Sequence, residues 1–132
     1  MILVVDNNVF VSGMMFPESY PGLILDHFLD MRFTLALDDR IYIEYAAVIN
    51  RKKFGFKKKD VFSLLTFIKN NALFVTPEKI VSALPDPSDL KFAEAAKASG
   101  ADGLITGNTR HFRSASKIVR IVTPREAWEQ LF

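Results

Sequence analysis

An apolar run that ends directly in an acid opens the chain. Ile2–Val5 is apolar at every position, and Asp6 follows at once. A strand with one face in water alternates apolar and polar residues, whereas a continuous run is typical of a strand covered on both faces. Strands of that kind occur in parallel sheets, where neighbouring strands are joined through helices. The run therefore predicts an α/β fold with a carboxylate at the carboxyl end of a buried strand.

The remaining sequence alternates short apolar runs with helical spacing. Further strands are predicted over residues 33–37, 73–76, 104–106 and 119–122. Helices are predicted over residues 8–15 and 22–31, from a cap at Asp38 or Asp39, around Val61 and Ile68, from a cap at Asp86 with Pro87 after it, and from Pro124. A chain of 132 residues suits one core. We therefore expect a single domain over residues 1–132, with three layers, α/β/α, around a mostly parallel central sheet.

Composition excludes several classes of site. The chain contains no cysteine, which rules out disulfides, thiolate metal sites and a cysteine nucleophile. The amino terminus lacks the pattern of a signal peptide, and no apolar run approaches the roughly 18 residues of a membrane span, so we expect a cytoplasmic protein with no membrane segment. The net charge is only +2, so binding of nucleic acid would depend on clustered basic residues.

Four polar residues lie where a solvated charge is not expected. Asp6 and Asn108 each follow a predicted strand, and sites in parallel sheets gather at the carboxyl ends of strands. Glu44 lies beside the apolar stripe of the third helix, because apolar residues stand three positions before it and four after it. Asp89 heads the apolar face of the fifth helix. These positions are candidates for one site.

Several carboxylates aimed at one pocket would repel one another, and a divalent cation would relieve that repulsion. The candidate ligands are all oxygen donors, which favours Mg²⁺ or Mn²⁺ and, with it, phosphodiester hydrolysis. Purely structural roles for the same residues remain as alternatives to a metal site. Asp6, Asp86 and Asn108 are also suited to capping helices, and Glu44 to pairing with a lysine or arginine.

Two groups of basic residues accompany these positions. Arg51, Lys52 and Lys53 follow the third helix, and Arg110, His111 and Arg113 follow Asn108. A run of charge is usually only a solvated face, but the second group begins beside a proposed ligand, where phosphates would lie. His111 is a candidate proton donor, against the simpler interpretation of a surface histidine.

At these residues the chain resembles the PIN-domain family of metal-dependent ribonucleases, and in particular its branch of toxin components of toxin–antitoxin pairs. The segments that carry the resemblance are VVDNNVFVSG, IYIEYAAVINRKKF, LPDPSDLKFAEAAKASGADGLITGN and TRHF, in family order. The third segment is the most specific of them. The resemblance spans essentially the whole chain.

The resemblance implies a role for each matching residue. Asp6, Glu44 and Asp89 match the catalytic acids, which also bind the metal, and Asn108 falls where many members have a fourth aspartate. Supporting roles are expected for Asn8, Asp86 and Thr106, and RNA-binding roles for Arg51, Lys52, Lys53, Arg110, His111 and Arg113. The sequence departs from the family in having asparagine at position 7, where threonine is common, and at position 108, where one negative charge is lost.

The implied function is a Mg²⁺- or Mn²⁺-dependent endoribonuclease. The resemblance further implies an RNA substrate, a small antitoxin protein that blocks the site, and a homodimer. One alternative is a non-catalytic RNA- or protein-binding module on the same fold, in which Asn108 marks lost activity. A metal-dependent phosphatase is a weaker alternative, because the residue two positions after Asp6 is not the second aspartate that such enzymes use.

Overall fold

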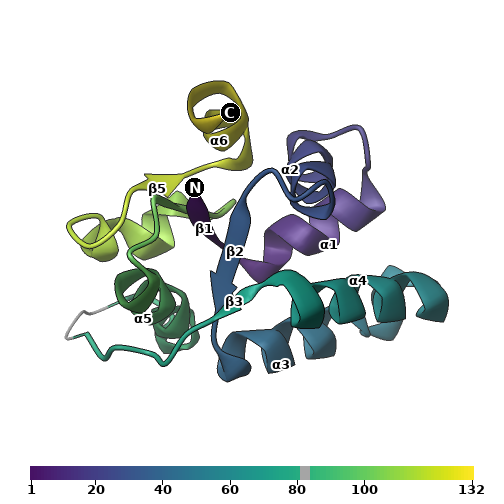
Figure 1. Ribbon diagram of the computed structural model, residues 1–132, viewed down its shortest axis with the longest axis horizontal. Helices are drawn as coiled ribbons and strands as arrows, with labels where there is room; N and C mark the ends of the chain where they lie inside the picture. The colour runs from purple at the N-terminus through teal and green to yellow at the C-terminus, as the bar shows by residue number, and fades with distance from the viewer. Residues whose placement is uncertain (81–83) are drawn as a thin grey trace.

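The computed structural model describes residues 1–80 and 84–132. Within them, the strands form one sheet in the order β3-β2-β1-β4-β5, with every pairing parallel. The strands are β1 (Ile2–Val5), β2 (Thr34–Leu37), β3 (Leu73–Phe74), β4 (Gly103–Ile105) and β5 (Ile121–Val122). The predicted parallel α/β class is confirmed. The first strand of the chain lies at the centre of the sheet (Figure 1).

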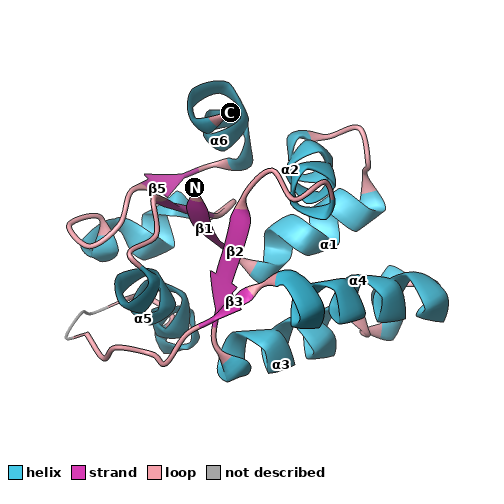
Figure 2. Ribbon diagram, viewed as in Figure 1, coloured by secondary structure: helices cyan, strands magenta, loops and turns pink. Residues whose placement is uncertain are grey.

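Helices cover the sheet on both sides and complete a three-layer α/β/α fold (Figures 1 and 2). The α-helices are α1 (Asn7–Met15), α2 (Tyr20–Leu29), α3 (Asp39–Ile49), α4 (Lys58–Asn71), α5 (Leu90–Ser99) and α6 (Pro124–Leu131). Short 3₁₀ helices are η1 (Lys52–Phe54), η2 (Pro87–Asp89) and η3 (Thr109–Ala115). In the described part of the chain, no helix is long and apolar enough to cross a membrane.

Burial of the strands explains why the apolar runs form them. Leu3, Val4 and Val5 are completely buried, although their side chains alternate between the two faces of the sheet. Helix α5 packs against β1, β2 and β4, while α1, α2 and α4 lie on the opposite side (Figure 1). A strand with helices on both faces must be apolar at every position, as the run at the start of the chain is.

Several element boundaries differ from the sequence prediction. The third strand is shorter than residues 73–76, and the second helix begins earlier than residue 22 because the Ser19 hydroxyl accepts a hydrogen bond from the backbone of Gly22. Asp38, rather than Asp39, caps the third helix. Its side chain accepts hydrogen bonds from the backbone N–H groups of Arg40 and Ile41. Asp86 caps only the 3₁₀ helix η2, so α5 starts at Leu90 and not beside Pro87.

Candidate active site

The parallel pairing of β1 with β4 brings together residues one hundred positions apart in sequence. The Thr106 hydroxyl donates to Asp6 Oδ2 at 2.8 Å, and it accepts the backbone N–H of Asn108 at 3.0 Å. Asp6 and Thr106 are both buried. Thr106 therefore fixes the Asp6 carboxylate and the start of the loop that carries Asn108.

Helix α3 holds Glu44 close to the end of β1. The buried Tyr45 hydroxyl donates to the carbonyl of Val5, which joins the residue after Glu44 to the residue before Asp6. The Asn7 amide then donates to Glu44 Oε2 at 2.9 Å. Glu44 thus lies beside the apolar stripe of its helix, as predicted, and faces the end of the strand.

Asp89 is the last residue of η2 and is partly buried. Its neighbour Asp86 is exposed and accepts hydrogen bonds from the backbone N–H and the hydroxyl of Ser88, which lower the Asp86 pKa. His111 Nδ1 lies 3.7 Å from Asp89 Oδ2. Asp86 therefore shapes the turn that presents Asp89.

The carboxylates of Asp6, Glu44 and Asp89 are here called the acidic cluster, because Asp6 interacts electrostatically with both of the others. Burial raises the pKa of Asp6, and the negative charge of Glu44 raises it further. Burial, followed by repulsion from Asp6 and Asp86, raises the pKa of Asp89 to about 6. A hydrogen bond from Thr106 and the backbone amides of Asn8 and Asn7 act the other way on Asp6. The cluster is therefore short of positive charge.

The capping alternatives for the two strand-end residues receive little support. Asp6 stands at the N-cap position of α1 and Asn108 at that of η3, yet neither side chain makes a cap hydrogen bond. Asn8 is exposed, and its backbone amide, not its side chain, is what favours the charged form of Asp6. The Asn108 side chain thus caps no helix, while the Asp6 carboxylate is held by Thr106 and by the first backbone amides of α1.

The chemistry of the acidic cluster fits a hard divalent cation, since its ligands are carboxylate oxygens and the pKa values of Asp6 and Asp89 are raised. As the side chains stand, no group of three His, Cys, Asp or Glu residues within the described ranges is arranged to hold one metal ion. Glu44 has both oxygens engaged, one by Asn7 and the other by Lys91 Nζ at 2.9 Å. A metal on Glu44 would therefore share the carboxylate with Asn7 and Lys91 or displace one of them.

Two other buried acids are already neutralised. Asp38 and Glu94 share the guanidinium of Arg40, at 2.7 and 3.0 Å. Glu94 Oε2 also accepts the backbone N–H of Ile80 at 3.4 Å. These pairs join the start of α3 to α5 and so hold the elements that carry Glu44 and Asp89. Their compensated charges distinguish them from the acidic cluster.

A groove of about 690 Å³ runs between α3 and the start of α5. Its polar lining includes Arg40, Glu44, Arg51, Ser88, Lys91 and Glu94. Apolar side chains, among them Ile43 and Leu90, complete it. The groove therefore reaches the acidic cluster at Glu44 and has three basic side chains in its lining.

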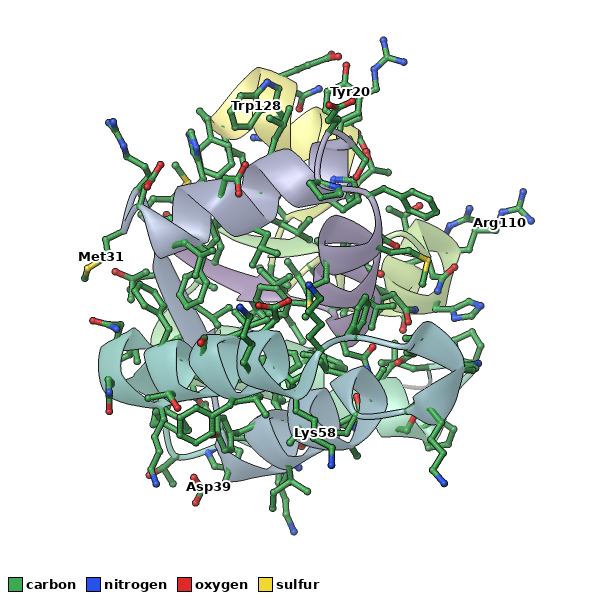
Figure 3. The ribbon with its side chains drawn as sticks, turned by 90° about the vertical axis from the view of Figure 1, so that its right-hand side faces the viewer. Tyr20, Met31, Asp39, Lys58, Arg110 and Trp128 are labelled. Atoms are coloured by element: carbon green, nitrogen blue, oxygen red, sulfur yellow. The ribbon has the colours of Figure 1, made fainter. Side chains whose placement is uncertain are left out.

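Three of the predicted RNA-binding residues line a groove or pocket beside the site, and the other three do not. Arg51 lines the groove, and Arg110 and His111 line a small pocket with Asn108. The three remaining residues are exposed and contribute to neither lining: Lys52, Lys53 and Arg113. Figure 3 shows the Arg110 side chain extending away from the body of the molecule.

Sequence reasoning missed Asn7 and Lys91, which bind the Glu44 carboxylate, and Glu94, which lines the groove. Asn7 was treated only as a departure from the family pattern, although it adjoins Asp6. Glu94 carried a usable signal, because it is an acid between alanines on a helix predicted to be buried. Lys91 carried none, since a lysine two positions after an aspartate is ordinary on a helix surface.

Two comparisons with known proteins bear on the family and the fold of the chain. A family model described as PIN domain matches residues 2–110. A solved structure, that of VapBC2 from Rickettsia felis bound to a DNA fragment from its promoter, contains a chain that superposes with a TM-score of 0.61. The two chains are 17% identical, and the match covers 93% of this chain and 98% of that one. No curated protein matches the sequence.

Proposed function

The chain belongs to the PIN-domain family, and on that premise we propose that it is a metal-dependent endoribonuclease, the toxin of a toxin–antitoxin pair. Members of this family are generally nucleases. The observation that carries the proposal is the acidic cluster at the end of the central strand, in which Glu44 raises the pKa of Asp6 and Asp6 raises the pKa of Asp89. Such a cluster is expensive to fold unless it binds a cation.

The residues that would hold Mg²⁺ or Mn²⁺ are Asp6, Glu44 and Asp89, with Asn108 beside them. The metal would neutralise charge on the phosphate and lower the pKa of a water molecule. Thr106 keeps Asp6 aimed into the site through its hydroxyl. Asn8 and Asp86 support the first turn of α1 and the turn before α5.

The basic residues would bind the RNA backbone. Arg51 in the groove and His111 beside Asp89 are the nearest to the acidic cluster. The more peripheral positions would contact flanking phosphates: Lys52, Lys53, Arg110 and Arg113. The predicted phosphodiester hydrolysis would leave a 5′-phosphate and a 3′-hydroxyl.

The proposal extends to the setting of the enzyme. Residues 1–132 would form one PIN-like domain that acts in the cytoplasm as a homodimer, with a small antitoxin protein blocking the site. The similar fold of a VapBC2 chain, part of a toxin–antitoxin complex, supports the antitoxin partner.

The function is tested by incubating the purified chain with end-labelled single-stranded RNA and either Mg²⁺, Mn²⁺ or a chelator. We expect cleavage only with metal, and products with 5′-phosphate ends. RNA binding without cleavage in either metal would favour the non-catalytic module. Hydrolysis of a small phosphomonoester without cleavage of RNA would favour the phosphatase.

Asn108→Asp is predicted to tighten Mn²⁺ binding while keeping activity. The two side chains are nearly isosteric, and the added carboxylate places a negative charge beside the cation. Without metal the same charge adds to the repulsion, so the melting temperature in chelator should fall by about 2–4 °C. Melting with Mn²⁺ should then rise more than it does in the wild type.

The matched control for this variant is Asn70→Asp, which makes the same change at an exposed position on α4. Its response to Mn²⁺ should equal that of the wild type. If Asn108→Asp also responds to metal as the wild type does, residue 108 lies outside the metal site.

A further inference from the structure

A lysine side chain lies inside the acidic site. Lys91 stands on the first turn of α5, and only 14% of its side chain is exposed. Its Nζ lies 2.9 Å from Glu44 Oε1, donates to the carbonyl of Ser88, and lies 5.5 Å from the centre of the Phe92 ring. The ammonium group is therefore held in one place by several partners.

The pair of Lys91 with Glu44 differs from a surface ion pair on the same helix. Lys97 pairs with Glu78 at 3.3 Å, but those side chains are 42% and 57% exposed, against 14% and 27% for Lys91 and Glu44. Exposed pairs are largely screened by water, whereas partly buried ones are not. Lys91 thus supplies effective positive charge to a cluster that is short of it.

Lys91 also binds the Glu44 carboxylate, which is one of the proposed metal ligands. Asn7 binds one oxygen of Glu44 and Lys91 binds the other. A divalent cation on the same carboxylate would lie close to the ammonium group and repel it. Both cannot neutralise Glu44 fully at the same time.

We propose that Lys91 is an internal counter-cation, which neutralises Glu44 in the metal-free protein and competes with divalent metal for that carboxylate. The inference rests on the proposed function only in taking Glu44 as a metal ligand. It makes Lys91 a positioning residue that acts through Glu44 and sets how much free metal the enzyme needs.

If Lys91 competes with the metal, its removal should change the metal affinity in the opposite direction from the removal of a purely structural partner. A partner that only orients a metal ligand lowers metal affinity when it is removed, typically by about 10- to 100-fold. Removal of a competitor raises metal affinity instead. The direction of the change therefore separates the two roles.

The experiment is calorimetric titration of the full chain with Mn²⁺ in the absence of RNA. We expect Lys91→Met to bind Mn²⁺ about tenfold more tightly than the wild type. Lys91→Arg, which keeps the charge, should bind close to the wild-type affinity. Lys97→Met, the matched control, removes the same charge from the same helix and should leave the affinity unchanged.

Melting in chelator provides a second measurement that needs no metal. Lys91→Met should lower the melting temperature by about 3 °C. This loss should be smaller in a Glu44→Gln background, where the ion pair with Glu44 is gone and Lys91 acts only on the more distant charge of Asp89. Lys91→Gln replaces Lys91→Met in both measurements if circular dichroism shows that the methionine variant does not fold.

The outcomes separate this inference from the proposed function. If the wild type binds Mn²⁺ and Lys91→Met binds it equally or more weakly, the competition is refuted while the metal site stands. If neither protein binds Mn²⁺, both the competition and the proposed metal site are refuted.

Discussion

Asp6→Asn is expected to reduce RNA cleavage by at least about a thousandfold, because a metal ligand contributes several kcal/mol to the transition state and each ~1.4 kcal/mol is tenfold in rate. Asp6 is the most deeply buried member of the acidic cluster and lies at the end of the central strand. Its replacement by a neutral amide would remove one negative charge from the proposed metal ligands. Cleavage of labelled RNA in Mn²⁺ by variant and wild type measures the loss.

The same substitution should leave the metal-free fold as stable as the wild type, or more stable. The raised pKa of Asp6 shows that burial and Glu44 disfavour its charge in the folded state. An asparagine is free of that penalty, and its amide oxygen can still accept the hydrogen bond of Thr106. Thermal melting in chelator checks this expectation.

Asp39→Asn is the matched control for Asp6→Asn. Asp39 is exposed on the first turn of α3 and points away from the molecule (Figure 3). This variant should cleave RNA at the wild-type rate. An Asp6→Asn variant that cleaves as well as Asp39→Asn would refute the role assigned to Asp6.

Asp89→Asn is expected to lower cleavage by about a hundredfold or more, for the same reason as at Asp6. It should also change how stability depends on pH. The Asp89 pKa is about 6 in the folded chain against 3.8 as the ordinary value. Between these values the folded state holds a proton that the unfolded state has released, so this group makes the wild type less stable as pH rises.

Urea denaturation in chelator at pH 4, 5, 6 and 7 measures the effect. The gain in unfolding free energy of Asp89→Asn over the wild type should grow with pH up to about 6 and then level off. Mn²⁺ binding to the wild type should weaken below about pH 6, because protonated Asp89 is a poor ligand.

The control for the pH effect is Asp86→Asn. The Asp86 pKa is lowered by the hydrogen bonds from Ser88, so its contribution to stability is present above pH 3.8 and is lost only as pH falls below that value. Between pH 4 and 7 the difference between this variant and the wild type should change much less than that of Asp89→Asn, because the variant removes only one of the two charges that repel Asp89. If the difference for Asp89→Asn changes as little, the Asp89 carboxylate does not feel the acidic cluster.

Local pattern was enough to predict the class of fold and the position of the acids. A continuous apolar run is typical of a strand covered on both faces in a parallel sheet, so Ile2–Val5 predicted the layer arrangement and placed Asp6 at a strand end. Helical spacing likewise placed Glu44 beside the apolar stripe of α3. Boundaries were less accurate at Asp86, because one capping residue suits a 3₁₀ turn as well as an α-helix.

The partners of those acids were decided by the tertiary structure alone. Spacing along one helix specifies a face, but the side chain opposite that face comes from another element whose position depends on the order of strands in the sheet. Because β1 lies between β2 and β4, Asp6 meets Thr106, and the packing of α3 against α5 sets Glu44 against Lys91. The sequence thus determined where charge is buried, and only the folded chain decided which group neutralises it.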